Sequence, residues 1–326
     1  MPYFSEKKTG LSCKVRHRED GSYLLENSQL AVTVYPWLGG KIGQLLHLPT
    51  GFQPVFQSTT PLRPANLYAD FSQYDTSGLD DAFPTIIEEN LTVAGASVHL
   101  PDHGEIWSAN FSHDEREHSL ALAMDSKILP YHYEKEISLE ENALVLHYTI
   151  ANTGSVPFSC HWTFHGLFIY HEDMQLLLPE GAVQAVNATD SLRFGAAGEI
   201  YGLPIGQLPG GKPWDFRRVP PPDPPSAEKF WLTEPVNQGR CGYLYPHAGL
   251  KVILEYNPAQ LPYLGCWITA GGFKGEYNCA LEPSNGYYDS VACAQRHNRC
   301  PLLIPGMPWD FTVKIRILPM PPKGGE

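Results

Sequence analysis

The sequence predicts an all-β fold, a large antiparallel β-sandwich that spans residues 1–326 as one domain. Short apolar runs with period-two alternation recur along the chain, and stretches with helical periodicity are scarce. The 29 glycines and 30 prolines indicate many turns and loops. There are too many predicted strands for a small barrel, and the absence of a fixed-period repeat counts against a propeller or a solenoid.

The predicted strands can be followed along the chain. Segments 30–35 and 41–46 flank a turn at 36–40, which is typical of a hairpin. Segment 159–170 is longer and more apolar, which predicts a central strand covered on both faces. The remaining predicted strands are 118–124, 131–139, 143–151, 229–233, 242–245, 250–256, 264–269, 277–282 and 311–318.

Other segments depart from this pattern. Helical periodicity is best in two short stretches, 80–89 and 290–295. The proline-rich segment 204–225 predicts an extended loop, because proline fixes φ and removes a backbone donor. A domain linker is the alternative, but strands of the same kind resume afterwards, which favours a loop excursion within one domain. The proline-rich tail 319–326 is expected to be frayed.

Charge and cysteine usage narrow the class of protein. A net charge of −12 argues against a nucleic-acid partner, since a basic surface is needed to meet phosphates. An apolar run of roughly 18 residues, as a membrane helix needs, is missing, and residues 1–8 do not resemble a secretory signal. The seven cysteines lack a C-x-x-C pair, which disfavours a zinc ribbon or a disulfide framework. We expect a cytoplasmic protein, either a monomer or a homodimer.

Glu282 is the first residue with a predicted chemical role. It follows the apolar run 279–281 and precedes Pro283 and the turn residues 285–286. This pattern predicts a strand that ends at a carboxylate, where a rigid scaffold presents a side chain to a loop. The alternative is an ordinary exposed carboxylate at a turn.

Two histidines lie in comparable settings. His103 lies in a predicted turn before Gly104, and Trp107 follows on what is expected to be the next strand. An aromatic face and an imidazole together suit a sugar site, although a turn histidine bonded to Asp102 is the simpler interpretation. His165 lies in an apolar run, where burial or a neighbouring carboxylate shifts its pKa.

Two further residues have open roles. His161 would face the same side of a strand as His165, as a substrate contact or a metal ligand; a metal is disfavoured because a third ligand is missing nearby. Asp81 follows Asp80 and is either part of a charge pair at a helix N-terminus or a contact to a sugar hydroxyl.

Four stretches together resemble the aldose 1-epimerase family, the galactose mutarotase-like proteins. They are 75–86, 100–104, 156–168 and 265–286, in the family's order. The resemblance implies a large antiparallel β-sandwich, often called a supersandwich. It also implies interconversion of the α and β anomers of a free aldohexose, a small-molecule carbohydrate, without a cofactor.

The resemblance also implies a role for each matching residue. Glu282 corresponds to the general base, His165 to the general acid, and His103 to a histidine that holds the sugar. Trp267, in the fourth stretch, is expected to contact the substrate. Arg63 is the available match for the family's arginine before the first histidine.

The chain departs from the family at several positions. The arginines that follow the first His-Gly in the hexose-phosphate branch are replaced by Glu105, Ile106 and Trp107, which favours an unphosphorylated sugar. Asp215 is the nearest match for the family's sugar-binding aspartate.

Two other functions stay open: a non-catalytic carbohydrate-binding sandwich, and a hydrolase or lyase on the same scaffold. A hydrolase would need a second carboxylate about 5–10 Å from Glu282, with Asp81 or Glu105 as the residues to test.

Overall fold

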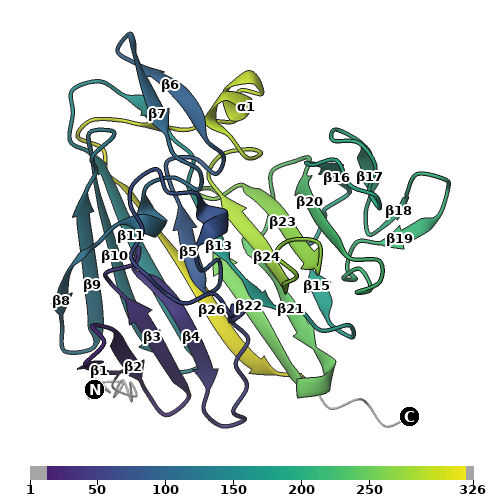
Figure 1. Ribbon diagram of the computed structural model, residues 1–326, viewed down its shortest axis with the longest axis horizontal. Coiled ribbons are helices and arrows are strands. Elements are labelled where there is room, and N and C mark those ends of the chain that lie inside the picture. The colour runs from purple at the N-terminus through teal and green to yellow at the C-terminus, as the bar shows by residue number, and fades with distance from the viewer. Residues whose placement is uncertain (1–12, 321–326) are drawn as a thin grey trace, which may run out of the picture.

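The computed structural model describes residues 13–320 and confirms the predicted all-β sandwich (Figure 1). The N-terminal segment 1–12 and most of the proline-rich tail lie outside the described residues, so the expectations about them stay untested. Among the described helices, none combines the length and apolarity needed to cross a membrane.

The larger sheet contains twelve of the strands found within residues 13–320, all paired antiparallel. The N-terminal hairpins form one half of it, and strands from the second half of the chain form the other half (Figure 1). Its order is β1 (Lys14–His17), β2 (Tyr23–Glu26), β3 (Leu30–Tyr35), β4 (Lys41–His47), β5 (Leu79–Ala82), β13 (Thr163–Gly166), β24 (Tyr277–Ser284), β23 (Tyr263–Ala270), β20 (Ser226–Leu232), β16 (Gln184–Asn187) and β17 (Ile200–Gly202), with β14 (Phe168–Ile169) also pairing with β24.

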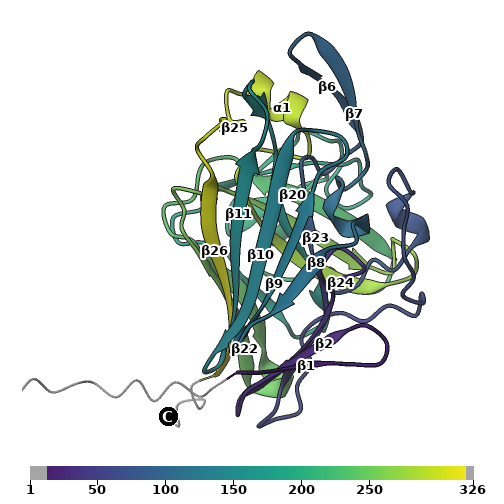
Figure 2. The ribbon, with the colours of Figure 1, turned by 90° about the vertical axis from the view of Figure 1, so that its left-hand side faces the viewer.

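The smaller sheet contains eight strands of the described chain and packs against one face of the first (Figure 2). Its long strands alternate buried and partly exposed residues, because one face packs against the larger sheet and the other meets solvent. Its order is β15 (Gln175–Leu177), β21 (Arg240–Tyr245), β22 (Leu250–Tyr256), β26 (Trp309–Pro319), β11 (Ala143–Asn152), β10 (Tyr131–Glu140), β9 (Ser119–Asp125) and β8 (Ser112–Glu115).

Several short elements lie outside the two large sheets. The hairpin of β6 (Glu89–Val93) and β7 (Ala96–Leu100) lies beside α1 (Val291–Arg296) at one end of the sandwich (Figure 1). Ser290 caps α1 by accepting from the Cys293 N–H at 3.0 Å, so the short helix predicted at 290–295 is confirmed. The other short elements are β12 (Phe158–Ser159) paired with β25 (Leu302–Leu303), and the 3₁₀ turns η1 (Phe71–Gln73), η2 (Ile106–Ser108) and η3 (Pro246–Ala248).

The core between the sheets is aromatic and contains one buried ion pair. Asp81 of the larger sheet meets Lys135 of the smaller one at 2.8 Å, and the Tyr148 hydroxyl donates to the same carboxylate at 2.9 Å. Both charged side chains are at most 1% exposed. A buried pair of this kind adds little stability itself, but loss of one partner leaves an uncompensated charge in the core.

Three expectations about local structure are wrong or incomplete. Residues 80–89 do not form a helix, since β5 and β6 occupy their two ends. The run 159–170 is three short strands, because β13 pairs with β5 whereas β14 pairs with β24. The proline-rich segment 204–225 contains a hairpin of β18 (Ile205–Gln207) and β19 (Pro213–Asp215).

The strand that contains Glu282 also runs further than predicted. β24 continues to Ser284, so Glu282 lies inside the strand and pairs with Gly265. Pro283 is tolerated there because β24 meets β14 at residues 278–279 and β13 at Ser284, which leaves its outer edge unpaired in between.

Candidate active site

A pocket of about 190 Å³ opens on the face of the larger sheet that points away from the smaller sheet. Strands β13, β20, β23 and β24 supply its floor, and the loops around residues 71, 103, 273 and 289 supply its walls. It contains all three residues for which the sequence predicted a catalytic role, Glu282, His165 and His103.

The pleat of the sheet determines which side chains reach the pocket. Residues directly opposite each other on paired strands point to the same face. His165 lies opposite Asp80, whereas the neighbouring Phe164 lies opposite Asp81. Because Asp81 is bonded to the second sheet, Phe164 also points into the core and His165 points out to the pocket.

The same rule accounts for the other half of the floor. Lys229 pairs with Trp267, Trp267 pairs with Ala280, and Gly265 pairs with Glu282. Gly265 and Trp267 lie two residues apart on one strand, as do Ala280 and Glu282 on the next. The side chains of Lys229, Trp267 and Glu282 therefore point to the same face of the sheet, the one that lines the pocket. Strand register thus brings together residues that are more than fifty positions apart in the chain.

Gly265 makes room for the carboxylate of Glu282. A Cβ at this position would lie 2.8 Å from Glu282 Oε2 and 3.0 Å from the Trp231 ring. A glycine in a strand interior usually weakens the strand, but here it allows close approach of a functional side chain.

Glu282 is a buried carboxylate without hydrogen bonds. Its side chain is 0% exposed, and among the described residues neither oxygen has a hydrogen-bond partner. Oε2 lies 3.3 Å from Lys229 Nζ, and Oε1 lies 4.0 Å from His165 Nε2. Burial raises the pKa of Glu282, although the charge on Lys229 opposes the rise. The carboxylate can therefore accept a proton from a ligand, or a hydrogen bond that a ligand hydroxyl group donates.

His165 lies across the pocket from Glu282. Burial lowers the pKa of His165 well below its usual range, and electrostatic repulsion by the nearby His103 and Lys229 lowers it further. The pKa values of the carboxylate and the imidazole are thus shifted toward each other. A pair of this kind exchanges protons at small cost, which suits acid–base chemistry.

His103 is held by an unusual turn. Its φ is +58°, and that of the following Gly104 is +71°. A Cβ on Gly104 would lie 2.1 Å from the Phe83 carbonyl oxygen, so only glycine fits. The His103 ring stacks on Phe71 with centroids 3.9 Å apart and meets the His165 ring edge-on at 4.9 Å. Its Nδ1 contacts Asp102 Oδ1 at 3.0 Å.

Lys229 and Asp289 also line the pocket, and the sequence reasoning missed both. Lys229 Nζ lies 2.9 Å from Asp289 Oδ1 and thereby links two carboxylates. The two carboxylates outweigh the effect of burial and raise the pKa of Lys229, which keeps it cationic. The available signal was a lysine at the start of an apolar strand, since a lysine buried there requires an anionic partner.

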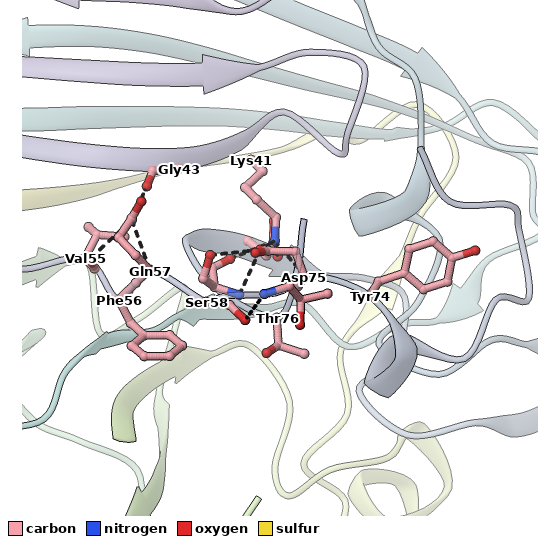
Figure 3. A network of polar contacts seen from close by, with 12 residues as sticks. Lys41, Gly43, Val55, Phe56, Gln57, Ser58, Tyr74, Asp75 and Thr76 are labelled. Atoms are coloured by element: carbon pink, nitrogen blue, oxygen red, sulfur yellow. Dashed lines mark hydrogen bonds and ion pairs between the residues drawn. The ribbon is translucent and has the colours of Figure 1, made fainter. Parts of the chain in front are cut away.

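A second buried lysine supports the pocket from outside it. Lys41 Nζ donates to the carbonyls of Asp75 and Ser77 at 3.0 and 2.7 Å and meets the Asp75 carboxylate at 3.1 Å (Figure 3). It also lies 3.0 Å from Asp80, whose pKa burial raises to about 6 despite that cation. These bonds fix the segment that carries Thr76, whose hydroxyl donates to Glu276 in the pocket wall at 3.0 Å.

Four of the expected substrate contacts lie elsewhere. Asp81 is in the core with Lys135, because the pleat turns it away from the pocket. Trp107 lies on the η2 turn rather than on a strand, behind the wall and edge-on to Phe71 at 5.1 Å. The remaining two are Arg63, which stacks over Tyr74 at 4.3 Å, and His161, whose Nε2 is 2.7 Å from the Ser284 hydroxyl.

Three carboxylates considered from the sequence also bind other side chains outside the pocket. Glu105 accepts hydrogen bonds from Ser126 and Tyr131 at 2.6 and 2.9 Å, and Asp215 pairs with Arg217 at 2.9 Å. Together with Asp81, they lie outside the pocket lining. The carboxylates that do share the pocket with Glu282 are Asp289 and Glu276.

A larger cavity of about 540 Å³ lies next to Tyr263, Arg299 and Trp309. Its one charged lining residue among those described, Arg299, donates to the Thr233 carbonyl and pairs with Glu234 at 3.2 Å. The smaller pocket is therefore the stronger candidate site, because titratable groups with shifted pKa values converge there.

Comparison with known proteins supports the assignment of the fold. No family model and no curated protein matches this sequence. Solved structures do match: a galactose mutarotase related enzyme from Lactobacillus acidophilus has a TM-score of 0.64 at 14% identity, covering 94% of this chain and 100% of its own. The chain has the galactose mutarotase-like fold.

Two further structures agree. A galactose mutarotase-like protein from Clostridium acetobutylicum gives a TM-score of 0.64 at 14% identity, covering 95% of this chain and 99% of its own. The Slr1438 protein from Synechocystis sp. PCC 6803 gives 0.70 at 18% identity, with 97% and 99% covered. At such identities the likeness establishes the mutarotase-like fold, and function has to be argued from the pocket.

Proposed function

We propose that this protein is an aldose 1-epimerase, which interconverts the anomers of a free aldohexose. The supporting observation is the Glu282 carboxylate, buried in the pocket floor with its Oε1 4.0 Å from His165 Nε2. An acid and a base at this separation can act on the two oxygens bonded to one anomeric carbon. His103, edge-on to His165, is placed to bind the same sugar.

The reaction needs two coupled proton transfers. Glu282 takes the proton from the C1 hydroxyl while protonated His165 gives a proton to the ring oxygen, and the C1–O5 bond breaks. Rotation about C1–C2 presents the other face of the aldehyde, and ring closure returns both protons. Each group contributes about 10²–10⁴ in rate, so the pair needs no cofactor.

The shifted pKa values serve these roles. A carboxylate whose pKa is raised is a stronger base, and an imidazolium whose pKa is lowered is a stronger acid. The same shifts reduce the fraction of enzyme with an ionised Glu282 and a protonated His165. Lys229 opposes this loss on the carboxylate side, because its charge stabilises the ionised form of Glu282.

The pocket lining favours an uncharged sugar. The one lysine or arginine among its described residues, Lys229, is already bound between two carboxylates, so a phosphate would lack a free cationic partner. Trp267, Phe71 and Phe273 offer aromatic surface for the C–H faces of a pyranose. A volume of about 190 Å³ suits a monosaccharide better than a longer saccharide.

Glycoside hydrolysis is the second function to weigh. It would need a second carboxylic acid that can give up a proton, and Asp289 is the nearest carboxylate. However, its Oδ1 is held by Lys229 at 2.9 Å and by the Trp231 indole N–H at 3.1 Å. These two donors already occupy Oδ1, which disfavours Asp289 as the group that protonates a leaving oxygen.

Polarimetry of α-glucose and α-galactose tests the proposal. We expect the protein to accelerate equilibration and Glu282→Gln to lose at least about 10²-fold in kcat. Glu276→Gln is the matched control, since Glu276 lines the same pocket but is bonded to Ser58 and Thr76. If the protein leaves several free aldoses at the buffer rate, or if both variants lose activity equally, the proposal is wrong.

A further inference from the structure

Two histidines and an aspartate converge outside the sugar pocket, where the chain crosses from one sheet to the other. His171 and Asp173 lie on the turn between β14 of the larger sheet and β15 of the smaller sheet. His247 lies on the η3 turn between β21 and β22. Their metal-binding atoms lie within 4.8 Å of one another.

The geometry of the three side chains is compact. His171 Nδ1 lies 2.6 Å from Asp173 Oδ1, and His247 Nδ1 lies 3.0 Å from the same oxygen. The two imidazole rings are nearly parallel, with centroids 3.7 Å apart and an angle of 21°. Both rings thus present a nitrogen atom to the same carboxylate oxygen.

Hydrogen bonds alone are the simpler explanation, because each neutral ring can donate its Nδ1–H to the carboxylate. They do not account for the choice of donors, however. Three good metal ligands from two distant chain segments bring their ligand atoms within 4.8 Å of one another. We propose that His171, Asp173 and His247 bind one divalent metal ion of the zinc class.

The donor set suits zinc in particular. Zinc commonly takes two imidazoles and a carboxylate, with water in the fourth position, at bonds of about 2.0–2.2 Å. Ligand atoms of a zinc tetrahedron are then about 3.4 Å apart, and the three ligand atoms here lie within 4.8 Å of one another, so small side-chain rotations would bring them to a shared ion. The side chains are 32–46% exposed, so an ion and its water reach them from solvent.

The location indicates a structural role. Tyr245, next to η3, donates its hydroxyl to the Ile169 carbonyl at 3.0 Å, so the two segments are already in contact. An ion between His171 and His247 would join them a second time and fasten the crossover to the β21–β22 turn. Because ion binding requires the folded arrangement, it adds to the stability of the folded state.

Zinc binding to the untagged full-length protein, after dialysis against a chelator, tests this site. We expect one Zn²⁺ per chain by calorimetry, a higher Tm with zinc, and visible d–d absorption with Co²⁺ as the probe. Asp173→Asn keeps a hydrogen-bond acceptor but is a poor zinc ligand. It should weaken binding at least about tenfold, since even indirect partners of a metal ligand contribute that much.

His132→Ala is the matched control. His132 contacts Asp125 through Nδ1 at 2.7 Å and Glu134 through Nε2 at 3.2 Å, so its carboxylates lie on opposite ring edges and cannot share an ion. This variant should bind zinc as the wild type does. The proposal fails if the wild type binds no zinc, or if Asp173→Asn and His247→Gln bind it unchanged. Chelation should leave mutarotation intact, and loss of activity would contradict a structural site.

Discussion

The lysine beside Glu282 provides a direct test of the proposed chemistry. Lys229→Met keeps an unbranched side chain and removes the charge that lies 3.3 Å from Oε2. Asp289 remains nearby, so the ionised form of Glu282 loses an attraction and keeps a repulsion. The pKa of Glu282, already raised by burial, rises further. The base is then protonated at higher pH, and the acid limb of the kcat/KM profile moves up.

The size of the shift follows from the distance. Two unit charges 3.3 Å apart interact by about 5 kcal/mol at an effective dielectric constant of about 20. At about 1.36 kcal/mol per pKa unit, this bounds the shift at roughly 3.7 units. Water that enters beside the methionine screens part of this interaction, so we expect an upward shift of at least about one unit.

Asp289→Asn should shift the profile in the opposite direction. The carboxylate of Asp289 raises the pKa of Glu282, so its removal lowers that pKa and moves the acid limb down. Polarimetric initial rates, extrapolated to zero buffer concentration, give the profiles, and urea unfolding confirms that the variants are folded. Lys274→Met, at an exposed lysine bonded to the Tyr74 carbonyl, should leave the profile unchanged. Shifts of equal sign in the two pocket variants would refute the electrostatic argument.

Three further substitutions test other parts of the structure. Gly265→Ala places a Cβ 2.8 Å from Glu282 Oε2, and displacement of the carboxylate should lower kcat by about 10²-fold in the polarimetric assay. Lys135→Met leaves Asp81 unpaired in the core and should reduce the free energy of unfolding by about 3–5 kcal/mol in urea, with Asp81→Asn restoring most of it. Trp267→Ala removes aromatic surface and should raise KM by roughly 3–10-fold with little change in kcat.

Most strands were predictable because their signal is local. The strand predicted at 250–256 matches β22, and the strand predicted at 30–35 matches β3. The helix expected at 80–89 is wrong because its evidence, helical periodicity, was local, whereas the burial of Asp80 and Asp81 depends on residues far away in the chain. Asp80 meets Lys41 and Asp81 meets Lys135, and these tertiary partners allow β5 to form.

The site was predictable only as far as the resemblance extended. Glu282, His165 and His103 could be matched to family motifs, and the structure brings them together. Lys229 and Asp289 depend on the register of β20, β23 and β24, which the sequence pattern does not fix. Asp81 illustrates the sensitivity to register, since a shift of one residue along β5 moves a carboxylate from the pocket face into the core.

The pocket meets two requirements that oppose each other. A strong base needs burial, which raises the pKa of Glu282, but a base must also be ionised, which burial disfavours. A hydrogen-bonded partner would restore ionisation and at the same time occupy the oxygens that must receive the proton. Lys229 eases this conflict, because it stabilises the charge from the side of Oε2, at 3.3 Å, and leaves Oε1, which lies 4.0 Å from His165 Nε2, to receive the proton. Asp289 then holds Lys229 in place, so the lysine–aspartate pair is part of what makes Glu282 usable as a base.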